Sequence, residues 1–195
     1  MKKILYIHGY NGNKHGVSYQ RIKKYAKGFD VVAIDYDQEK PNEAIRTILD
    51  YVYDNNIDLV IGSSLGGFLT MNCFDIPRVV INPCIMPVME LPKLGYKGPT
   101  SDYKILQKSL LNYKPDSLEK LTCIGCFGDN DELFGTKFLE TFKSKGYKAY
   151  NIQSTHQISE KGAKQLMEVI VPEFLDNLSN ISESIDKQDN NSHIF

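Results

Sequence analysis

One segment, Leu59-Val60-Ile61-Gly62-Ser63-Ser64-Leu65-Gly66-Gly67, joins a short apolar run to a Gly-x-Ser-x-Gly pattern. The run predicts a buried strand, and residues 66–74 predict a helix. In this context the pattern is typical of a nucleophile elbow, a sharp turn that strains Ser64 and exposes its hydroxyl above a sheet. Gly62 and Gly66 have no Cβ atom, so the strand and the helix can approach closely. The alternatives are a Gly-rich phosphate-binding loop and a plain strand–helix turn.

The same alternation of short apolar runs and amphipathic segments continues in both directions along the chain. Short, β-branched strands between helices indicate a parallel sheet that is covered on both faces. Right-handed connections then predict a doubly wound, mostly parallel α/β fold. The predicted strands are 3–8, 30–35, 57–62, 78–81, 121–127 and 147–152, and the predicted helices are 18–27, 41–54, 66–74, 135–145 and 159–178.

A chain of 195 residues has the length of about one domain. We expect a single domain over residues 1–178, with an insertion at about 82–119 that holds five of the eight prolines and one helix at 101–112. The insertion is expected to form a small cap over the carboxyl edge of the sheet, where α/β sheets bind ligands; a plain surface loop is the alternative. Residues 179–195 are rich in Ser, Asn and Asp and are expected to form a mobile polar tail.

The charge balance and the apolar runs exclude several classes of function. The chain has 23 Lys and Arg residues against 24 Asp and Glu residues, which leaves no basic footprint for nucleic acid. No apolar run approaches the roughly 20 residues that span a bilayer. The N-terminal apolar run, residues 4–7, is shorter than the about 7–15 residues of a secretory signal. We therefore expect a cytoplasmic protein.

The four cysteines are Cys73, Cys84, Cys123 and Cys126, too few for a disulfide scaffold in a chain of this length. The Cys123-x-x-Cys126 spacing could belong to a zinc or redox site. However, both residues lie in a predicted strand, where residues three apart point to opposite faces. No second pair of ligands with zinc spacing follows, so we expect structural thiols and no metal or other cofactor.

A serine hydroxyl needs a base to become an effective nucleophile, and the chain has four histidines for that role. His156 follows the last predicted strand, so its loop opens at the same sheet edge as Ser64. We therefore assign His156 as general base and then general acid; an exposed loop histidine is the alternative. His8 ends the first strand, His15 lies in the next loop, and His193 lies in the expected tail.

The base in turn needs a carboxylate that orients it. Asp129 and Asp131 both follow the fifth predicted strand, and the order Ser64, Asp131, His156 is that of nucleophile, acid and base in hydrolases. Asp131 is favoured because it lies further into the loop, and Asp129 remains the competing candidate. A calcium loop is excluded because the required glycine and bidentate glutamate are missing from their positions.

Acyl transfer also needs donors for the negative charge that develops on the carbonyl oxygen. The backbone N–H of Leu65, directly after the nucleophile, is the first candidate. The backbone N–H of Tyr10, in the loop after the first strand, is the second. Gly9 and Gly12 would let this loop pass close to a substrate.

Five motifs occur in this order along the chain: Tyr6-Ile7-His8-Gly9-Tyr10-Asn11, Gly62-Ser63-Ser64-Leu65-Gly66-Gly67, Ile81-Asn82-Pro83, Gly128-Asp129-Asn130-Asp131-Glu132 and Thr155-His156. Together they resemble the α/β-hydrolase superfamily, and most closely its small bacterial YqiA-type esterases, over roughly residues 3–176. The resemblance implies a Ser64–Asp131–His156 triad, an oxyanion hole from the Tyr10 and Leu65 amides, and hydrolysis of short or medium acyl esters or thioesters without a metal. The pair Ser154-Thr155 departs from the Gly-Asn or Gly-Gly that often precedes the family's histidine.

The residues and the resemblance lead to one leading hypothesis, a serine esterase that forms an acyl-enzyme on Ser64. Its partner would be a small-molecule acyl ester, with no nucleic acid and no membrane-spanning segment involved. The alternatives are a non-catalytic binding module on a hydrolase scaffold and an amidase or peptidase with the same triad. Because about 40 inserted residues can roof only a modest cavity, small acyl groups should be favoured.

Overall fold

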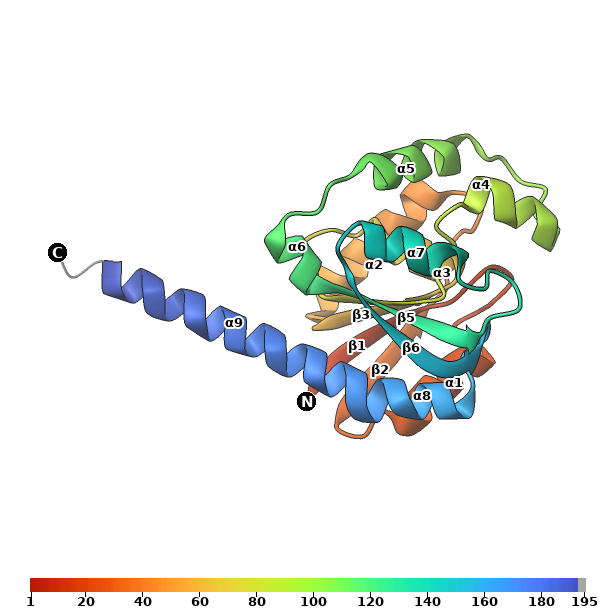
Figure 1. Ribbon diagram of the computed structural model, residues 1–195. Coiled ribbons are helices and arrows are strands. Elements are labelled where there is room, and N and C mark those ends of the chain that lie inside the picture. The colour runs from red at the N-terminus through yellow and green to blue at the C-terminus, as the bar shows by residue number, and fades with distance from the viewer. Residues whose placement is uncertain (193–195) are drawn as a thin grey trace.

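The computed structural model describes the backbone of residues 1–192 and the side chains of residues 1–183, so His193 lies outside the described residues. Six strands form one parallel sheet (Figure 1). They are β1 (Lys2–Ile7), β2 (Phe29–Ile34), β3 (Leu59–Ser63), β4 (Arg78–Ile81), β5 (Cys123–Asn130) and β6 (Lys148–Thr155). Their order is β2-β1-β3-β4-β5-β6, so the direction of winding reverses between β1 and β3. The predicted doubly wound α/β fold is confirmed.

Helices cover both faces of this sheet. One face carries α1 (Val17–Tyr25), α8 (Glu160–Gln165), the π-helical turn η2 (Leu166–Ile170) and the start of α9 (Val171–Ser192). The other face carries α2 (Pro41–Asn55), α3 (Leu65–Met71), α5 (Ser101–Asn112) and α7 (Lys137–Ser144). The short helices α4 (Pro87–Glu90), η1 (Leu91–Leu94) and α6 (Ser117–Thr122) complete the described part of the chain.

The strands are buried on both sides, as expected of a sheet between two helical layers. Along β1, Leu5 and Ile7 pack into one hydrophobic cluster and Ile4 and Tyr6 into the other, which is the alternation of a strand. Each side of the sheet therefore has its own core, and a one-residue slip in register would exchange the two.

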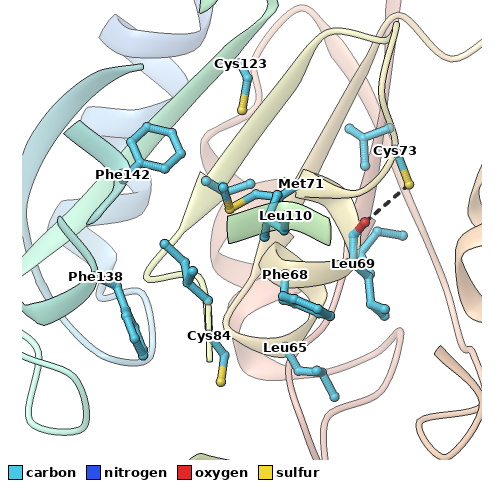
Figure 2. Close-up of a cluster of buried hydrophobic side chains, with 14 of the residues drawn as sticks. Leu65, Phe68, Leu69, Met71, Cys73, Cys84, Leu110, Cys123, Phe138 and Phe142 are labelled. Carbon is cyan, nitrogen blue, oxygen red and sulfur yellow. Dashed lines mark hydrogen bonds between the residues drawn. The ribbon is translucent and has the colours of Figure 1, made fainter. Parts of the chain in front are cut away.

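The cysteines follow the same alternation. Cys123 and Cys126 belong to opposite clusters, as predicted, and all four cysteines are free and buried. Figure 2 shows Cys73, Cys84 and Cys123 among the apolar side chains of one cluster. Burial raises the pKa of Cys84 and of Cys126 to about 12. These thiols are therefore packing groups in the described structure.

The insertion at 82–119 contains the predicted helix, α5, with the expected bounds, and three further short helices. It packs on the layer formed by α2 and α3: Tyr103 and Leu110 are fully buried there, and the Tyr103 hydroxyl donates to the Gln38 carbonyl at 2.6 Å. Leu94 of the insertion reaches the cavity beside Ser64. The insertion thus acts as an outer layer over one side of the sheet (Figure 1).

The closing helix is longer than its sequence suggests. The prediction ended it at residue 178, but α9 continues to Ser192 and projects away from the sheet (Figure 1). Ser179 and Ser182 bond to the carbonyl oxygens of Leu175 and Leu178, one turn earlier, so these polar side chains are compatible with a helix. Among the residues that the structure describes, no helix has both the length and the apolar content needed to cross a membrane.

Candidate active site

Ser64 lies in the turn between β3 and α3, with φ 53° and ψ −115°. A residue with a side chain rarely adopts a positive φ, so this conformation is strained and must be held by its surroundings. The Ser64 N–H donates to the Ile81 carbonyl at 2.9 Å, and the Ser64 carbonyl accepts from Cys84 at 2.9 Å and from Phe68 at 3.1 Å. The predicted strained turn is therefore present, and β4 and the segment after it fix its shape.

Two glycines make this turn possible. A Cβ atom on Gly62 would overlap the Thr70 hydroxyl, and one on Gly66 would overlap the carbonyl oxygens of Ile7 and His8. The start of α3 therefore lies directly against the end of β1. This close approach brings the loop after β1 next to the nucleophile candidate.

The structure brings Ser64, His156 and Asp131 together. The Nε2 atom of His156 lies 3.0 Å from the Ser64 hydroxyl oxygen, and its Nδ1 atom lies 3.0 Å and 3.2 Å from the two carboxylate oxygens of Asp131. An ionised carboxylate only accepts hydrogen bonds, so Nδ1 carries the proton and Nε2 is left to accept from Ser64. This is the geometry of a nucleophile, a base and an orienting acid.

Asp131 sits in an environment that favours its charged form. Burial opposes ionisation, but hydrogen bonds from His156 and from the backbone N–H groups of Phe134 and Leu133 outweigh it and lower the pKa of the carboxyl. The Phe134 ring also contacts the imidazole of His156 edge to face, with ring centres 4.6 Å apart. The charge of Asp131 is thus available to hold an imidazolium.

Asp129, the competing candidate, is engaged elsewhere. Its carboxylate accepts from the backbone N–H of Ser154 at 3.0 Å and from the side chain of Asn130 at 3.0 Å. The contact with Ser154 holds the end of β6 against β5. Of the two aspartates, the one bonded to His156 is Asp131.

The two candidate oxyanion donors belong to segments that lie next to Ser64. Leu65 is the first residue of α3, where a backbone N–H has no partner within the helix. Tyr10 follows Gly9, and a Cβ atom on Gly9 would lie only 3.0 Å from the Ser64 Cβ atom. The loop that carries the Tyr10 N–H therefore passes directly beside the nucleophile candidate, and Tyr10 and Ser64 line the same cavity.

The other described histidines do not reach the Ser64 hydroxyl. His8 is buried, bonds through Nδ1 to the Gly9 carbonyl at 2.9 Å and stacks on Tyr36 at 4.6 Å. Burial lowers the pKa of His8, so it is neutral near pH 7. His15 is exposed in the next loop.

Two residues at the site were given no role by sequence reasoning. Asn82 has φ 42° and is only 1% exposed; its amide donates to the carbonyls of His156 at 2.9 Å and Thr155 at 3.1 Å, and its side-chain oxygen accepts from Gly128 at 2.8 Å. Glu132 accepts from the backbone N–H of His156 at 2.9 Å. Both residues hold the backbone of His156. The Asn-Pro pair after a short strand was the only available signal for Asn82.

The site opens into a cavity of about 310 Å³ whose lining includes Tyr10, Ser64 and His156. The hydrogen bonds from Ser64 through His156 to Asp131 support nucleophilic attack by Ser64 on an electrophile in this cavity. Among the described residues, no group of three or more His, Cys, Asp or Glu side chains is placed to hold a metal ion.

The fold is shared with many solved structures. Est1E from Butyrivibrio proteoclasticus matches with a TM-score of 0.64 and 15% identity, over 92% of this chain and 87% of that chain. The esterase domain of a Rhodothermus marinus protein matches with a TM-score of 0.62 and 14% identity, over 87% and 84%. Mouse alpha/beta hydrolase domain-containing protein 10 matches with a TM-score of 0.62 and 16% identity, over 90% of each chain. At these identities the likeness shows a common fold.

A family model gives a closer assignment. The model of the Uncharacterised protein family (UPF0227) matches residues 3–122, which include all of β1 except its first residue, the loop that carries Tyr10, the Ser64 turn and the Asn82-Pro83 pair. The chain belongs to this family, and its fold is that of the α/β hydrolases among its structural neighbours.

Proposed function

We propose that the protein is a serine hydrolase that cleaves short- to medium-chain carboxylic esters through an acyl-enzyme on Ser64. The single observation that carries this proposal is the continuous chain of hydrogen bonds from Ser64 through His156 to Asp131, with both links at 3.0 Å. The esterases among the structural neighbours support the same reaction class by fold analogy.

In the first half of the reaction, His156 Nε2 takes the proton of the Ser64 hydroxyl as the oxygen attacks the carbonyl carbon of the ester. The backbone N–H groups of Leu65 and Tyr10 receive the resulting oxyanion, a role that is worth about 3–4 kcal/mol for a single donor in other hydrolases. His156 then gives its proton to the departing alcohol. Ser64 is left as the acyl ester.

In the second half, His156 removes a proton from water, and the hydroxide attacks the acyl carbon. The tetrahedral intermediate collapses, Ser64 regains its proton from His156, and the acid leaves. Asp131 holds the imidazole in the tautomer that both halves require and stabilises the imidazolium that forms twice in the cycle.

The test is labelling by a fluorophosphonate probe combined with turnover of p-nitrophenyl acetate and butyrate. We expect the wild-type protein to form a covalent adduct on Ser64, seen by intact mass, and to hydrolyse both esters. Ser64→Ala should abolish both results, whereas Ser109→Ala, at an exposed serine on α5, should change neither. Turnover that survives Ser64→Ala would overturn the proposal. Absence of both labelling and turnover would indicate a binding module.

The size of the cavity limits the length of the acyl chain that we expect the protein to accept. About 310 Å³ lies at the lower end of the roughly 300–1,000 Å³ of small-molecule sites. We therefore expect kcat/KM to fall from acetate and butyrate esters to octanoate and longer esters. A preference for long chains would contradict this part of the proposal.

A further inference from the structure

The cavity beside Ser64 extends between the end of β1 and the start of α1. Its buried lining includes the hydroxyl side chains of Tyr6, Ser18 and Ser63, which are 2%, 9% and 5% exposed, beside His8, Tyr19 and Ser64. The aliphatic lining is more exposed: Val17 and Leu133 are 49% and 45% exposed, and Leu94 is half-buried. Most of the buried side chains that line the cavity therefore carry a polar group.

The three buried side chains form one hydroxyl cluster. Burial raises the pKa of Tyr6, although the neighbouring hydroxyls of Ser63 and Ser18 act in the opposite direction, so the phenol keeps its proton at neutral pH. A hydroxyl group has one donor and two acceptor lone pairs. The three hydroxyls can therefore both donate to a ligand and accept from it.

The described residues that line the cavity include no Asp, Glu, Lys or Arg side chain. The imidazole of His8, which also lines it, is neutral because burial lowers its pKa. A charged group of a substrate would thus be buried here without a counter-ion. An aliphatic chain would displace the water that bonds to the hydroxyls and would offer no hydrogen bonds in its place.

We propose that the favoured substrates are small esters that carry an uncharged polar group, such as a hydroxyl, close to the scissile bond, and that Tyr6, Ser18 and Ser63 bind this group. The inference rests on the proposed ester hydrolysis and adds the class of substrate to it. A hydroxyl satisfies the cluster because it both donates and accepts, and it needs no counter-ion.

The experiment compares matched ester pairs that differ by one hydroxyl. For the acyl side the pair is 4-nitrophenyl butyrate and 4-nitrophenyl 3-hydroxybutyrate; for the alcohol side it is ethyl butyrate and 2-hydroxyethyl butyrate. Each kcat/KM is divided by the rate of alkaline hydrolysis of the same ester, which removes intrinsic reactivity. One added neutral hydrogen bond predicts a preference of about 2- to 10-fold for the hydroxylated ester in at least one pair.

Variants assign that preference to the cluster. Tyr6→Phe and Ser18→Ala each remove one hydroxyl and should reduce the ratio within the pair toward one. Tyr25→Phe is the matched control, because Tyr25 lies on α1 but its hydroxyl bonds to Glu160 at 2.7 Å, away from the cavity. Circular dichroism spectra verify that each variant is folded, and Ser18→Ala provides the answer if Tyr6→Phe does not fold.

A ratio of one or below in both wild-type pairs would overturn the inference while leaving the hydrolase proposal intact. A preference that persists in both Tyr6→Phe and Ser18→Ala would also overturn it. Absence of any Ser64-dependent turnover would instead reject the proposed hydrolase, and the inference with it.

Discussion

The side-chain amide of Asn82 donates to the backbone carbonyl of His156 at 2.9 Å, across 74 residues of sequence. The same side chain also accepts from Gly128 at 2.8 Å, so it ties the loop after β4 to both β5 and the His156 loop. The carboxylate of Glu132 accepts a hydrogen bond from the backbone N–H of His156 at 2.9 Å. The position of the imidazole over Ser64 is therefore fixed through the backbone as well as through Asp131.

The substitution Asn82→Asp tests this positioning role. Aspartate keeps the shape of the side chain and the acceptor for Gly128, but it places a carboxylate oxygen against the carbonyls of Thr155 and His156. A displacement of about 1 Å at a catalytic group can cost about 10²-fold in rate. We expect kcat for p-nitrophenyl butyrate to fall by about 10- to 100-fold with a much smaller change in KM.

The matched control is Asn55→Asp, because the Asn55 amide also donates to a backbone carbonyl, that of Tyr51 at 3.0 Å, but on α2. The control should keep the wild-type kcat. If Asn82→Asp retained kcat within twofold of wild type, or if a smaller folded fraction measured by circular dichroism accounted for its lower kcat, the positioning role would be wrong.

Replacing each candidate acid separates Asp131 from Asp129. Asp131→Asn can no longer hold the productive histidine tautomer, and the equivalent change in a well-studied triad lowers kcat by about 10⁴-fold. We expect a loss of about 10³- to 10⁴-fold in kcat here. Asp129→Asn should leave kcat within about threefold and instead lower the melting temperature, because it weakens the contact to Ser154. The reverse result would assign the triad to Asp129.

The buried histidine at the end of β1 predicts a pH dependence of stability. Burial lowers the pKa of His8, against the opposing effects of the Gly9 carbonyl and of Asp35, which lies 3.5 Å from Nε2 and is also paired with Lys14. Below about pH 6.5 the imidazole of His8 therefore binds a proton in the unfolded chain, whereas in the folded protein it stays neutral until a lower pH. The free energy of unfolding should fall as the pH drops from 7 to 5.

Urea unfolding at several pH values measures this effect. In His8→Gln the decline between pH 7 and pH 5 should become shallower than in wild type. His15→Gln, at an exposed histidine, should keep the wild-type slope. Equal slopes for wild type and His8→Gln would show that His8 makes no such contribution.

The buried ion pair of Arg78 and Glu119 predicts a large effect on stability. Arg78 is fully buried, pairs with Glu119 and donates to the carbonyls of Cys73 and Ile76. Arg78→Met would leave the Glu119 charge buried without its partner, which costs about 3–5 kcal/mol of folding free energy. Chemical unfolding measures the loss.

The control for this pair is Lys24→Met. Lys24 pairs with Glu160 at 2.8 Å, but in contact with solvent, so its removal should leave the free energy of unfolding nearly unchanged. Similar losses for the two variants would contradict the view that burial, and not the presence of an ion pair, determines the effect.

Local patterns were sufficient for most of the fold. The strand at 78–81 and the helix at 101–112 were predicted with the bounds that the structure shows, because an apolar run and a helical periodicity depend on near neighbours. The strain at Ser64 was also predicted, because Gly62 and Gly66 allow the strand and the helix to approach closely at this turn. The sequence did not predict the end of α9, because Ser and Asn residues that suggest a tail can also lie on an exposed helix.

The choice between Asp129 and Asp131 shows where local information ends. The two residues carry the same group, two positions apart, and the sequence predicted that the strand stops at residue 127. In the structure β5 continues to Asn130, with an irregularity in its pairing with β6 between Gly128 and Asn130. Asp129 therefore belongs to the paired strand, and Asp131 is the first residue free to turn toward His156.

Patterns of near neighbours were enough to predict the six strands, the longer helices, the strained serine and the sheet edge where the partners of Ser64 lie. They could not predict which carboxylate contacts His156, that Asn82 holds the histidine loop, or that Tyr6, Ser18 and Ser63 line the same cavity. The reason is separation along the chain: Ser64 and His156 are 92 residues apart, and Asn82 and His156 are 74 apart. Contacts of this range depend on how the layers pack, which no local pattern of residues records.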